Sequence, residues 1–166
     1  MRLRLECLFM LVAMTLAIPG VAAAQPRVSI GAGGGMAGST DASLSDGRGA
    51  PIVMGQVTVS AVPLIGVGVE VDDWRRSGSN IVFATAHAQI HVPATPFYLK
   101  LGGGFGTGDP DGRGTISGAA GQIGAAYDIT LPLAPVALTL FGNAFLAHAS
   151  SRSMQLVDAG LALTWR

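Results

Sequence analysis

The sequence predicts an all-β protein, an eight-stranded antiparallel up-and-down barrel, and three observations lead to that prediction. Of 166 residues, 49% are hydrophobic and only 12% are charged, which excludes a disordered chain. Apolar and polar residues alternate at period two in eight segments, as in strands whose two faces meet different environments. The connections between segments are alternately tight and long, which is typical of an up-and-down meander.

The first segment predicts export. Two arginines precede an apolar stretch over residues 8–18, and alanines occupy positions 22–24. A basic start, an apolar run and small residues at the cleavage point define a helical, cleavable secretory signal peptide. We therefore expect a signal peptide over 1–24 and one domain over 25–166. The only cysteine, Cys7, lies in the signal segment, so no disulfide holds the domain.

The eight predicted strands share a clear division into two faces. In the third strand, Val67 and Val69 lie on one face, while Gly68 and Glu70 lie on the other. A helical period fits none of the segments. The predicted strands are 28–37, 51–62, 64–74, 80–92, 97–106, 114–128, 135–148 and 154–165.

Two kinds of connection join these strands. Tight connections that contain proline lie around Pro63, at 93–96 and over 130–135. The connections between them are more polar and hold many of the charged residues of the domain; they are 39–50, 75–79, 107–113 and 149–153. We therefore expect tight turns at one end of the barrel and long polar loops at the other.

The composition of the two faces indicates that the barrel is transmembrane. The polar face consists of Gly, Ser, Thr and Gln rather than Lys and Glu, which suits a narrow interior better than a water-facing surface. Large aromatic residues lie at the segment ends, as in an interfacial aromatic girdle. At the turn end these are Phe97, Tyr127 and Trp165, and at the loop end Trp74, Phe83 and Phe105.

These features, together with the terminal pattern Val157-x-Ala159-x-Leu161-x-Leu163-x-Trp165, resemble the small eight-stranded outer-membrane β-barrel family of Gram-negative bacteria. The outer membrane protein A barrel is its best known example. The resemblance implies a porin-like fold located in the cell outer membrane, in contact with outer-membrane lipid and lipopolysaccharide. It also implies recognition by the barrel-assembly machinery during biogenesis. We expect a monomer, and the lack of a basic excess argues against a nucleic-acid partner.

An eight-stranded barrel has an interior just wide enough for side chains to fill. The turn at 93–96 predicts that Gln89 lies opposite Lys100 and that His91 lies opposite Tyr98. A buried lysine needs a partner, and Glu70 and Asp128 are the candidates for Lys100. We expect a structural plug rather than an ion pathway. The inward polar set is predicted to include Gln56, Thr58, Glu70, His87, Gln89, Lys100, Gln122, Asp128 and Asp158.

Other motifs predict neither a cofactor nor a metal. The segment 33–38 fits G-x-G-x-x-G, but no helix follows it, so dinucleotide binding is not predicted. Asp109 and Asp111 lack the remaining ligands of a calcium loop. His87 and His91 are about 13 Å apart along one strand, too far for a simple shared metal site.

One pair of residues hints at catalysis. His148 and Ser150 are similar to the His-x-Ser pair on the outer surface of outer-membrane lipid A deacylases, but the acid that would orient the histidine is not evident. We therefore predict a non-enzymatic outer-membrane barrel with a filled lumen, which acts through exposed loops or as a structural envelope component. Two alternatives stay open: a deacylase-like enzyme that uses His148 and Ser150, and a soluble periplasmic barrel. The soluble barrel would bind an apolar ligand inside and would need its Val and Leu face to point inward.

Overall fold

The computed structural model shows a closed barrel of eight antiparallel strands. In the part of the chain that it describes, no helix is long and apolar enough to cross a membrane. The predicted signal peptide over 1–24 lies outside this part. The described residues are 25–39, 49–62, 64–110, 114–132, 134–149 and 152–165.

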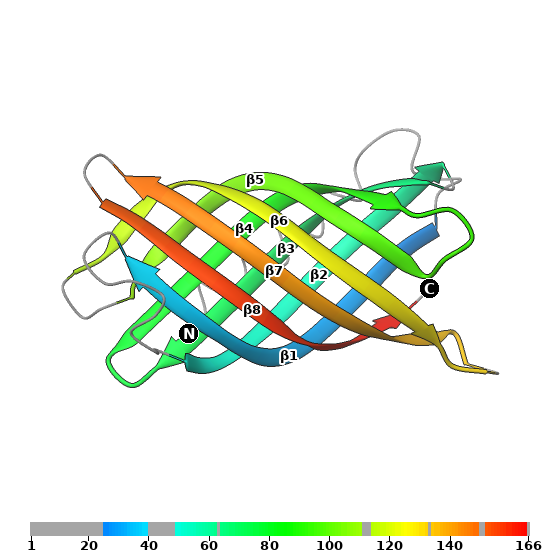
Figure 1. Cartoon of the computed structure of the whole chain (residues 1–166), viewed down its shortest axis with the longest axis horizontal. Coiled ribbons are helices and arrows are strands. Elements are labelled where there is room, and N and C mark those ends of the chain that lie inside the picture. Colours follow the sequence, from blue (N-terminus) through cyan, green and yellow to red (C-terminus); the bar gives the residue numbers. More distant parts are fainter. Residues whose placement is uncertain are drawn as a thin grey trace.

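Each strand pairs with its neighbours in the sequence, and β1 closes the barrel against β8. Val28 lies opposite Trp165 and Ser39 lies opposite Met154 in the closing pair. The strands cross the barrel obliquely, as Figure 1 shows. Their bounds are β1 (Gln25–Ser39), β2 (Gly49–Val62), β3 (Ile65–Arg76), β4 (Ser79–His91), β5 (Phe97–Asp109), β6 (Ile116–Thr130), β7 (Val136–Ala149) and β8 (Arg152–Trp165).

The two ends of the barrel differ in their connections. We call the end with the β1–β2, β3–β4, β5–β6 and β7–β8 connections the loop end; it lies on the left of Figure 1. The end with the β2–β3, β4–β5 and β6–β7 connections is the turn end, where β1 also begins and β8 ends. The predicted register of the β4–β5 hairpin is confirmed, because Gln89 lies opposite Lys100 and His91 opposite Tyr98.

The prediction that all four loop-end connections are long is wrong. Only Ser77 and Gly78 separate β3 from β4, and Gly78 adopts a φ of 77°, which glycine tolerates because it has no Cβ. Similarly, β7 continues to Ala149 and β8 begins at Arg152. The polar residues that predicted loops there continue the hydrogen-bonded ladder, because backbone pairing does not depend on the polarity of the side chains.

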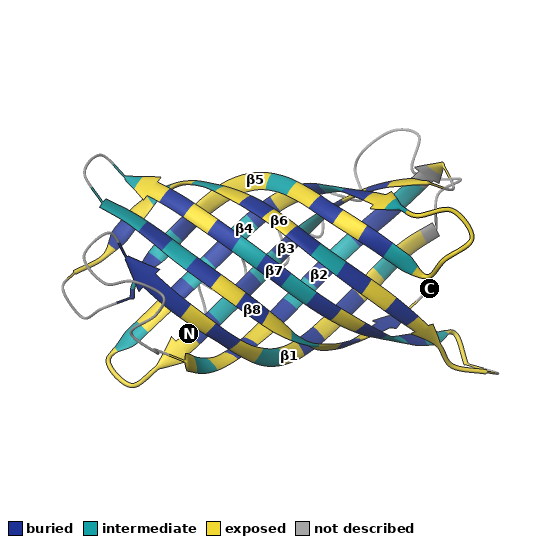
Figure 2. Ribbon diagram, viewed as in Figure 1, coloured by how far each residue is buried: buried dark blue, intermediate teal, exposed yellow. Residues whose placement is uncertain are grey.

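Burial alternates along the strands, and Figure 2 shows the resulting checkerboard. On β3, Val67 is 56% exposed while Glu70 is 0% exposed. On β8, Leu161 is exposed and its neighbour Ala162 is buried. The apolar faces therefore point outward and the polar faces point inward, as the period-two pattern predicts.

Inward glycines make room for large interior side chains. A Cβ on Gly160 would lie 2.4 Å from the Ala32 carbonyl oxygen and 2.8 Å from Cζ of the Phe141 ring. A Cβ on Gly31 would also lie 2.9 Å from this ring. Glycine is therefore required where β1 and β8 approach each other beneath Phe141.

Candidate functional site

A belt of apolar side chains surrounds the barrel. Leu101 is 64% exposed and Ile123 is 62% exposed, and no outward position of the belt is charged. Only Tyr127 and Trp165 have a polar atom in their side chains at these positions. We define the apolar belt as every second residue, both ends included, of 28–36, 53–57, 65–71, 82–90, 97–105, 119–129, 136–146 and 157–165.

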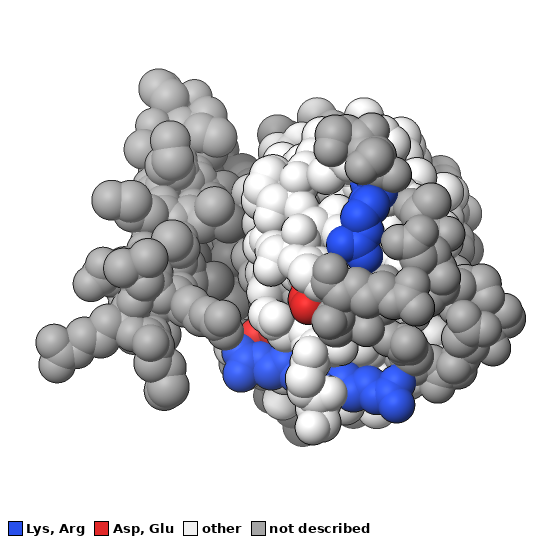
Figure 3. Space-filling model, turned by 90° about the vertical axis from the view of Figure 1, so that its left-hand side faces the viewer, with Lys and Arg blue, Asp and Glu red and all other residues white. Residues whose placement is uncertain are grey.

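Beyond the belt, toward the loop end, the outward face becomes polar. Asp73 and Arg75 form an exposed ion pair on β3, and the hydroxyls of Thr107 and Ser117 are 2.6 Å apart between β5 and β6. Figure 3, which faces the loop end, shows basic side chains around this border. The exposed Asp73–Arg75 pair therefore lies beyond the belt, at the loop end of β3.

A buried ion pair lies inside the barrel. Lys100 Nζ donates to both carboxylate oxygens of Glu70, at 2.9 and 2.6 Å, and both side chains are at most 1% exposed. Asn143 Nδ2 donates to Glu70 Oε1 at 2.9 Å and to Asp158 Oδ1 at 3.2 Å. The predicted need of Lys100 for an inward carboxylate is confirmed, and of the two candidates Glu70 is the partner.

Amides and hydroxyls extend this polar interior. Gln89 Nε2 donates to Thr58 Oγ1 at 3.1 Å and lies 3.3 Å from His87 Nε2. The other ring nitrogen of His87, Nδ1, is 3.9 Å from the Glu70 carboxylate. On the β4–β6 side, Thr85 Oγ1 donates to Gln122 Oε1 at 2.6 Å. These hydrogen bonds satisfy part of the buried polar groups, while His87 Nδ1 and Gln122 Nε2 have no hydrogen-bond partner among the described residues.

A second network lies closer to the turn end and ties four strands together. Arg27 of β1 pairs with Asp128 of β6. Thr139 Oγ1 of β7 donates to Asp128 Oδ1 at 2.7 Å and lies 2.7 Å from the Thr164 hydroxyl of β8. The Thr164 hydroxyl is in turn 2.8 Å from the Ser29 hydroxyl of β1. The network therefore links strands across the closing seam of the barrel.

The structure places all the predicted polar residues inside the barrel: Gln56, Thr58, Glu70, His87, Gln89, Lys100, Gln122, Asp128 and Asp158. The predicted set omits the charged and amide residues Arg27, Asp72 and Asn143 of the same interior. It also omits the hydroxyl residues Ser29, Thr85, Thr139 and Thr164. Each of them occupies one of the alternate strand positions that face inward, and this position in the alternation is the sequence signal that could have identified it. Asp72 is buried next to Glu70, so the described interior holds more carboxyls than basic side chains.

The loop-end part of the interior is apolar rather than polar. Phe83 and Phe145 stack there with ring centroids 4.7 Å apart, and Trp74 Nε1 donates to the Gly35 carbonyl oxygen at 3.0 Å. We call this cluster the apolar plug; its buried members are Ala37, Ile52, Trp74, Ile81, Phe83, Ile116, Phe145, Ala147, Met154 and Leu156.

The plug corrects one prediction about the aromatic girdle. Trp74 and Phe83 are both 0% exposed and point into the barrel, so they cannot anchor it at a membrane surface. Each shares the inward phase of its strand, Trp74 with Glu70 and Phe83 with His87. A barrel this narrow needs large side chains to fill it, and these two rings fill its loop end.

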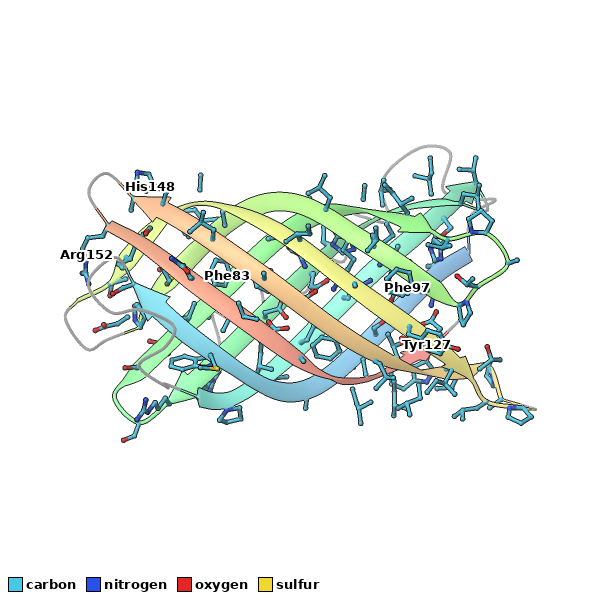
Figure 4. The ribbon with its side chains drawn as sticks, in the orientation of Figure 1. Phe83, Phe97, Tyr127, His148 and Arg152 are labelled. Atoms are coloured by element: carbon cyan, nitrogen blue, oxygen red, sulfur yellow. The ribbon has the colours of Figure 1, made fainter. Side chains whose placement is uncertain are left out.

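The four remaining girdle residues lie on the outer side of their strands. Phe97 lies opposite Tyr127 in the β5–β6 pair, and Figure 4 shows both at the turn end. Trp165 at the end of β8 is 41% exposed, and Phe105, further toward the loop end, is 51% exposed. Three of the four outward rings therefore lie at the turn end.

The catalytic pair of the first alternative is only partly described. His148 is exposed on the outward face at the loop end of β7, as Figure 4 shows, and Ser150 lies outside the described residues. Asp158, a carboxyl on the adjoining strand β8, is buried in the barrel. Among the described residues, no group of three or more His, Cys, Asp or Glu side chains could hold a metal ion.

The second alternative, a soluble barrel with an apolar ligand inside, is contradicted. It requires the Val and Leu face to point inward, and this face points outward: Val67 is 56% exposed and Leu161 is 47% exposed. The interior instead contains the buried Glu70–Lys100 ion pair.

No protein-family model and no curated protein matches the sequence. Solved structures do match the fold. Ail, the attachment invasion locus protein of Yersinia pestis, in complex with the heparin analogue sucrose octasulfate, aligns with a TM-score of 0.57 at 14% identity. The alignment covers 86% of this chain and 99% of Ail. Neisserial surface protein A aligns with a TM-score of 0.56 at 14% identity, over 84% of this chain and 97% of that one.

The N-terminal β-barrel domain of Pseudomonas aeruginosa OprF aligns with a TM-score of 0.51 at 11% identity, over 86% of this chain and 99% of that domain. All three are small eight-stranded outer-membrane β-barrels. Sequence identities this low establish similarity of fold only. This chain therefore has the fold of the small eight-stranded outer-membrane β-barrels, as the resemblance in its sequence implies.

Proposed function

We propose that this protein is an integral outer-membrane barrel with a lumen filled by side chains, and that it acts without catalysis. The observation that carries the proposal is the charge-free apolar belt. Monomeric soluble proteins rarely expose contiguous apolar patches larger than a few hundred Å². A belt around the whole barrel would be unfavourable in water, whereas in hydrocarbon it faces its preferred solvent.

The interior supports a filled lumen. Eight strands leave a bore that side chains can fill, and the apolar plug occupies its loop end. The rest holds the Glu70–Lys100 pair with its partner Asn143, the second network, and a further buried apolar cluster that includes Tyr98 and Phe141. We therefore expect a structural interior and no sustained large conductance in planar bilayers.

The loop end supports a role at the cell surface. It carries the exposed charges of the described strands, including Arg75, Arg76 and Arg152. We propose that the protein acts through this end or as a structural component of the envelope, in contact with outer-membrane lipid and lipopolysaccharide. A closed barrel exposes no unpaired strand edge, which supports a monomer that the barrel-assembly machinery inserts during biogenesis.

A non-enzymatic role is supported by the surroundings of His148. A histidine that serves as general base for serine needs an acid to orient it. The adjoining strand offers Asp158, which is buried inside the barrel and hydrogen-bonded to Asn143. We expect purified protein to release no acyl chains from lipopolysaccharide. Release that disappears in Ser150→Ala would contradict this part of the proposal.

Cell fractionation tests the location. We expect the protein in the outer-membrane fraction after urea or carbonate washes, and faster gel migration without heating than after heating. Leu101→Lys, which places a charge in the belt, should reduce the folded membrane-bound form, whereas the matched variant Ser77→Lys at the loop end should not. Recovery of wild-type protein from the periplasm without detergent would contradict the proposal.

A further inference from the structure

The interior of the barrel is divided into two sections along its length. On four strands the inward residues change from apolar to polar in the same order, from the loop end toward the turn end. The residues on either side of this border are Trp74 and Asp72 on β3, Phe83 and Thr85 on β4, Phe145 and Asn143 on β7, and Leu156 and Asp158 on β8. We call the inward residues from this border to Arg27 and Asp128, near the turn end, the polar section.

The apolar plug offers water no free hydrogen-bonding group. Its one side-chain nitrogen or oxygen is Trp74 Nε1, which donates to the Gly35 carbonyl oxygen at 3.0 Å. The plug also packs closely against the wall of the barrel. A Cβ on Gly106 would lie 2.7 Å from Cε1 of Phe83, and one on Gly35 would lie 3.1 Å from Cδ1 of Leu156. An apolar interior of this kind stays dry.

The polar section differs, because several of its buried atoms lack partners. Neither carboxyl oxygen of Asp72 accepts a hydrogen bond from the described residues, and Asp158 Oδ2 and Asn143 Oδ1 accept none either. Gln122 Nε2 donates none. All four side chains belong to buried residues. Buried polar groups in proteins are paired with other groups or with ordered water. These four side chains therefore have free capacity to bind water.

Polar contacts continue from this border toward the turn end along β2–β4. His87 Nδ1 is 3.9 Å from Glu70, and His87 Nε2 is 3.3 Å from Gln89 Nε2. Gln89 Nε2 also donates to Thr58 Oγ1 at 3.1 Å. The second apolar cluster, which includes Phe141, takes all its members but one from β5–β8. The polar contacts therefore pass beside that cluster, whereas the plug faces them across the whole border.

The polar section is also acidic. Among the described residues its carboxyl groups outnumber its lysine and arginine side chains; the carboxyl groups are those of Glu70, Asp72, Asp128 and Asp158, and the basic side chains are Arg27 and Lys100. An acidic lining favours small cations over anions.

We infer that the apolar plug is the barrier that closes the lumen to water and ions, and that water occupies the polar section as far as this barrier. The inference rests on the proposed filled lumen and assigns the closure to one part of the filling. Hydrophobic constrictions exclude ions because water finds no partners there. The Glu70–Lys100 pair then stabilises the interior without closing it, and a path opened through the plug should favour monovalent cations.

The folded wild-type protein allows a first test. In perdeuterated protein refolded in detergent, NMR measures magnetisation transfer from water to side-chain N–H groups. We expect transfer to the side-chain amides of Gln122 and Asn143, and none to the indole N–H of Trp74. Transfer to Trp74 as strong as to the two amides would overturn the inference, because water would then reach the plug. Absence of transfer to both amides would overturn it too, because the polar section would then be dry.

Conductance of matched variants in planar bilayers gives the second test. The plug variant is Phe83→Ala with Phe145→Ala, and its control is Tyr98→Ala with Phe141→Ala, which removes two interior rings and leaves the plug intact. Each variant is first shown to be folded by its heat-modifiable gel mobility. We expect discrete openings only from the plug variant, with a reversal potential in a KCl gradient that shifts toward that of K⁺. The NMR measurement decides the inference if the plug variant does not fold.

A third variant examines the ion pair as the competing barrier. Glu70→Ala with Lys100→Ala removes the pair and leaves the plug intact, so we expect no openings from it. Openings from this variant or from the control as large as those of the plug variant would overturn the inference, and so would a folded plug variant that stays closed. Openings of the wild-type protein would instead contradict the filled lumen, and with it that part of the proposed function.

Discussion

The outer surface and the interior of this barrel consist of alternate residues of the same strands, yet around Lys100 each holds what a water-soluble protein places on the other side. Lys100 is 1% exposed inside, whereas its neighbour Leu101 is 64% exposed outside. In water this arrangement would expose apolar side chains and bury charge at the same time, and both changes are unfavourable. This difference is the physical basis for the proposal that the outer face lies in hydrocarbon rather than in water.

The largest expected effect comes from breaking the interior ion pair. Lys100→Met leaves the Glu70 carboxylate buried without its cation, and we expect a loss of about 3–5 kcal/mol in the free energy of unfolding. Urea unfolding from vesicles, followed by heat-modifiable gel mobility, measures this loss. The double variant Lys100→Met with Glu70→Leu should recover much of the stability, and equal losses in the single and double variants would contradict the pairing.

An effect of similar size is expected from the apolar plug. Phe83→Ala removes a ring that stacks on Phe145 inside the barrel, and such cavities cost about 3–5 kcal/mol. The matched outward variant is Phe105→Ala, where lipid chains can fill the space that the ring leaves. We expect the same unfolding measurement to show a clearly smaller loss for Phe105→Ala. A reversed order would mean that the assignment of the two faces is wrong.

A charge placed in the belt should lower the free energy of unfolding by a somewhat smaller amount. Leu101→Lys puts an ammonium group on the lipid-facing surface, which costs about 2–4 kcal/mol near the middle of the membrane. Ser77→Lys at the loop end should change the free energy of unfolding little, because the side chain stays in water. Equal stabilities of the two variants in vesicles would show that Leu101 does not face hydrocarbon.

The smallest expected effect is the difference in stability between alanine substitutions at two glycines, one inward and one outward. Gly160→Ala places a Cβ against the Ala32 carbonyl and the Phe141 ring, and overpacking of this kind costs about 1–3 kcal/mol. Gly121→Ala on the outer face of β6 meets no atom within 4 Å, so no clash is expected there. Refolding yields and urea midpoints of the two variants in the same lipid make the comparison, and a greater loss in Gly121→Ala would contradict it.

Much of the fold follows from the sequence because strand periodicity is a local property. The alternation around Val67 and Leu161 predicts both the strands and their outward faces. The proline turn at 93–96 sets the register that brings Gln89 opposite Lys100. Strand ends at the loop end are less predictable, because Arg75 and Arg152 have polar side chains typical of loops although their backbones lie in β-strands.

The interior follows from the sequence only in part. Phase along the strand is enough to place Asn143 and Asp72 inside, and it also places Trp74 and Phe83 there, although aromatic residues near strand ends resemble anchors. The Arg27–Asp128 pair is different, since it joins β1 to β6 across the barrel. Such a contact depends on closure and shear, which no local pattern encodes.

The most direct test of the central claim is to detect what touches the belt. In perdeuterated protein refolded in protonated detergent, NMR can measure magnetisation transfer to backbone amides from the detergent acyl chain and from water. We expect acyl-chain transfer at Ala86, Ile123 and Leu161 on the outer face, and at the loop-end hairpin residues Ser77 and Gly78 transfer from water only. Water transfer at Ala86, Ile123 and Leu161, with no acyl-chain signal, would contradict the account.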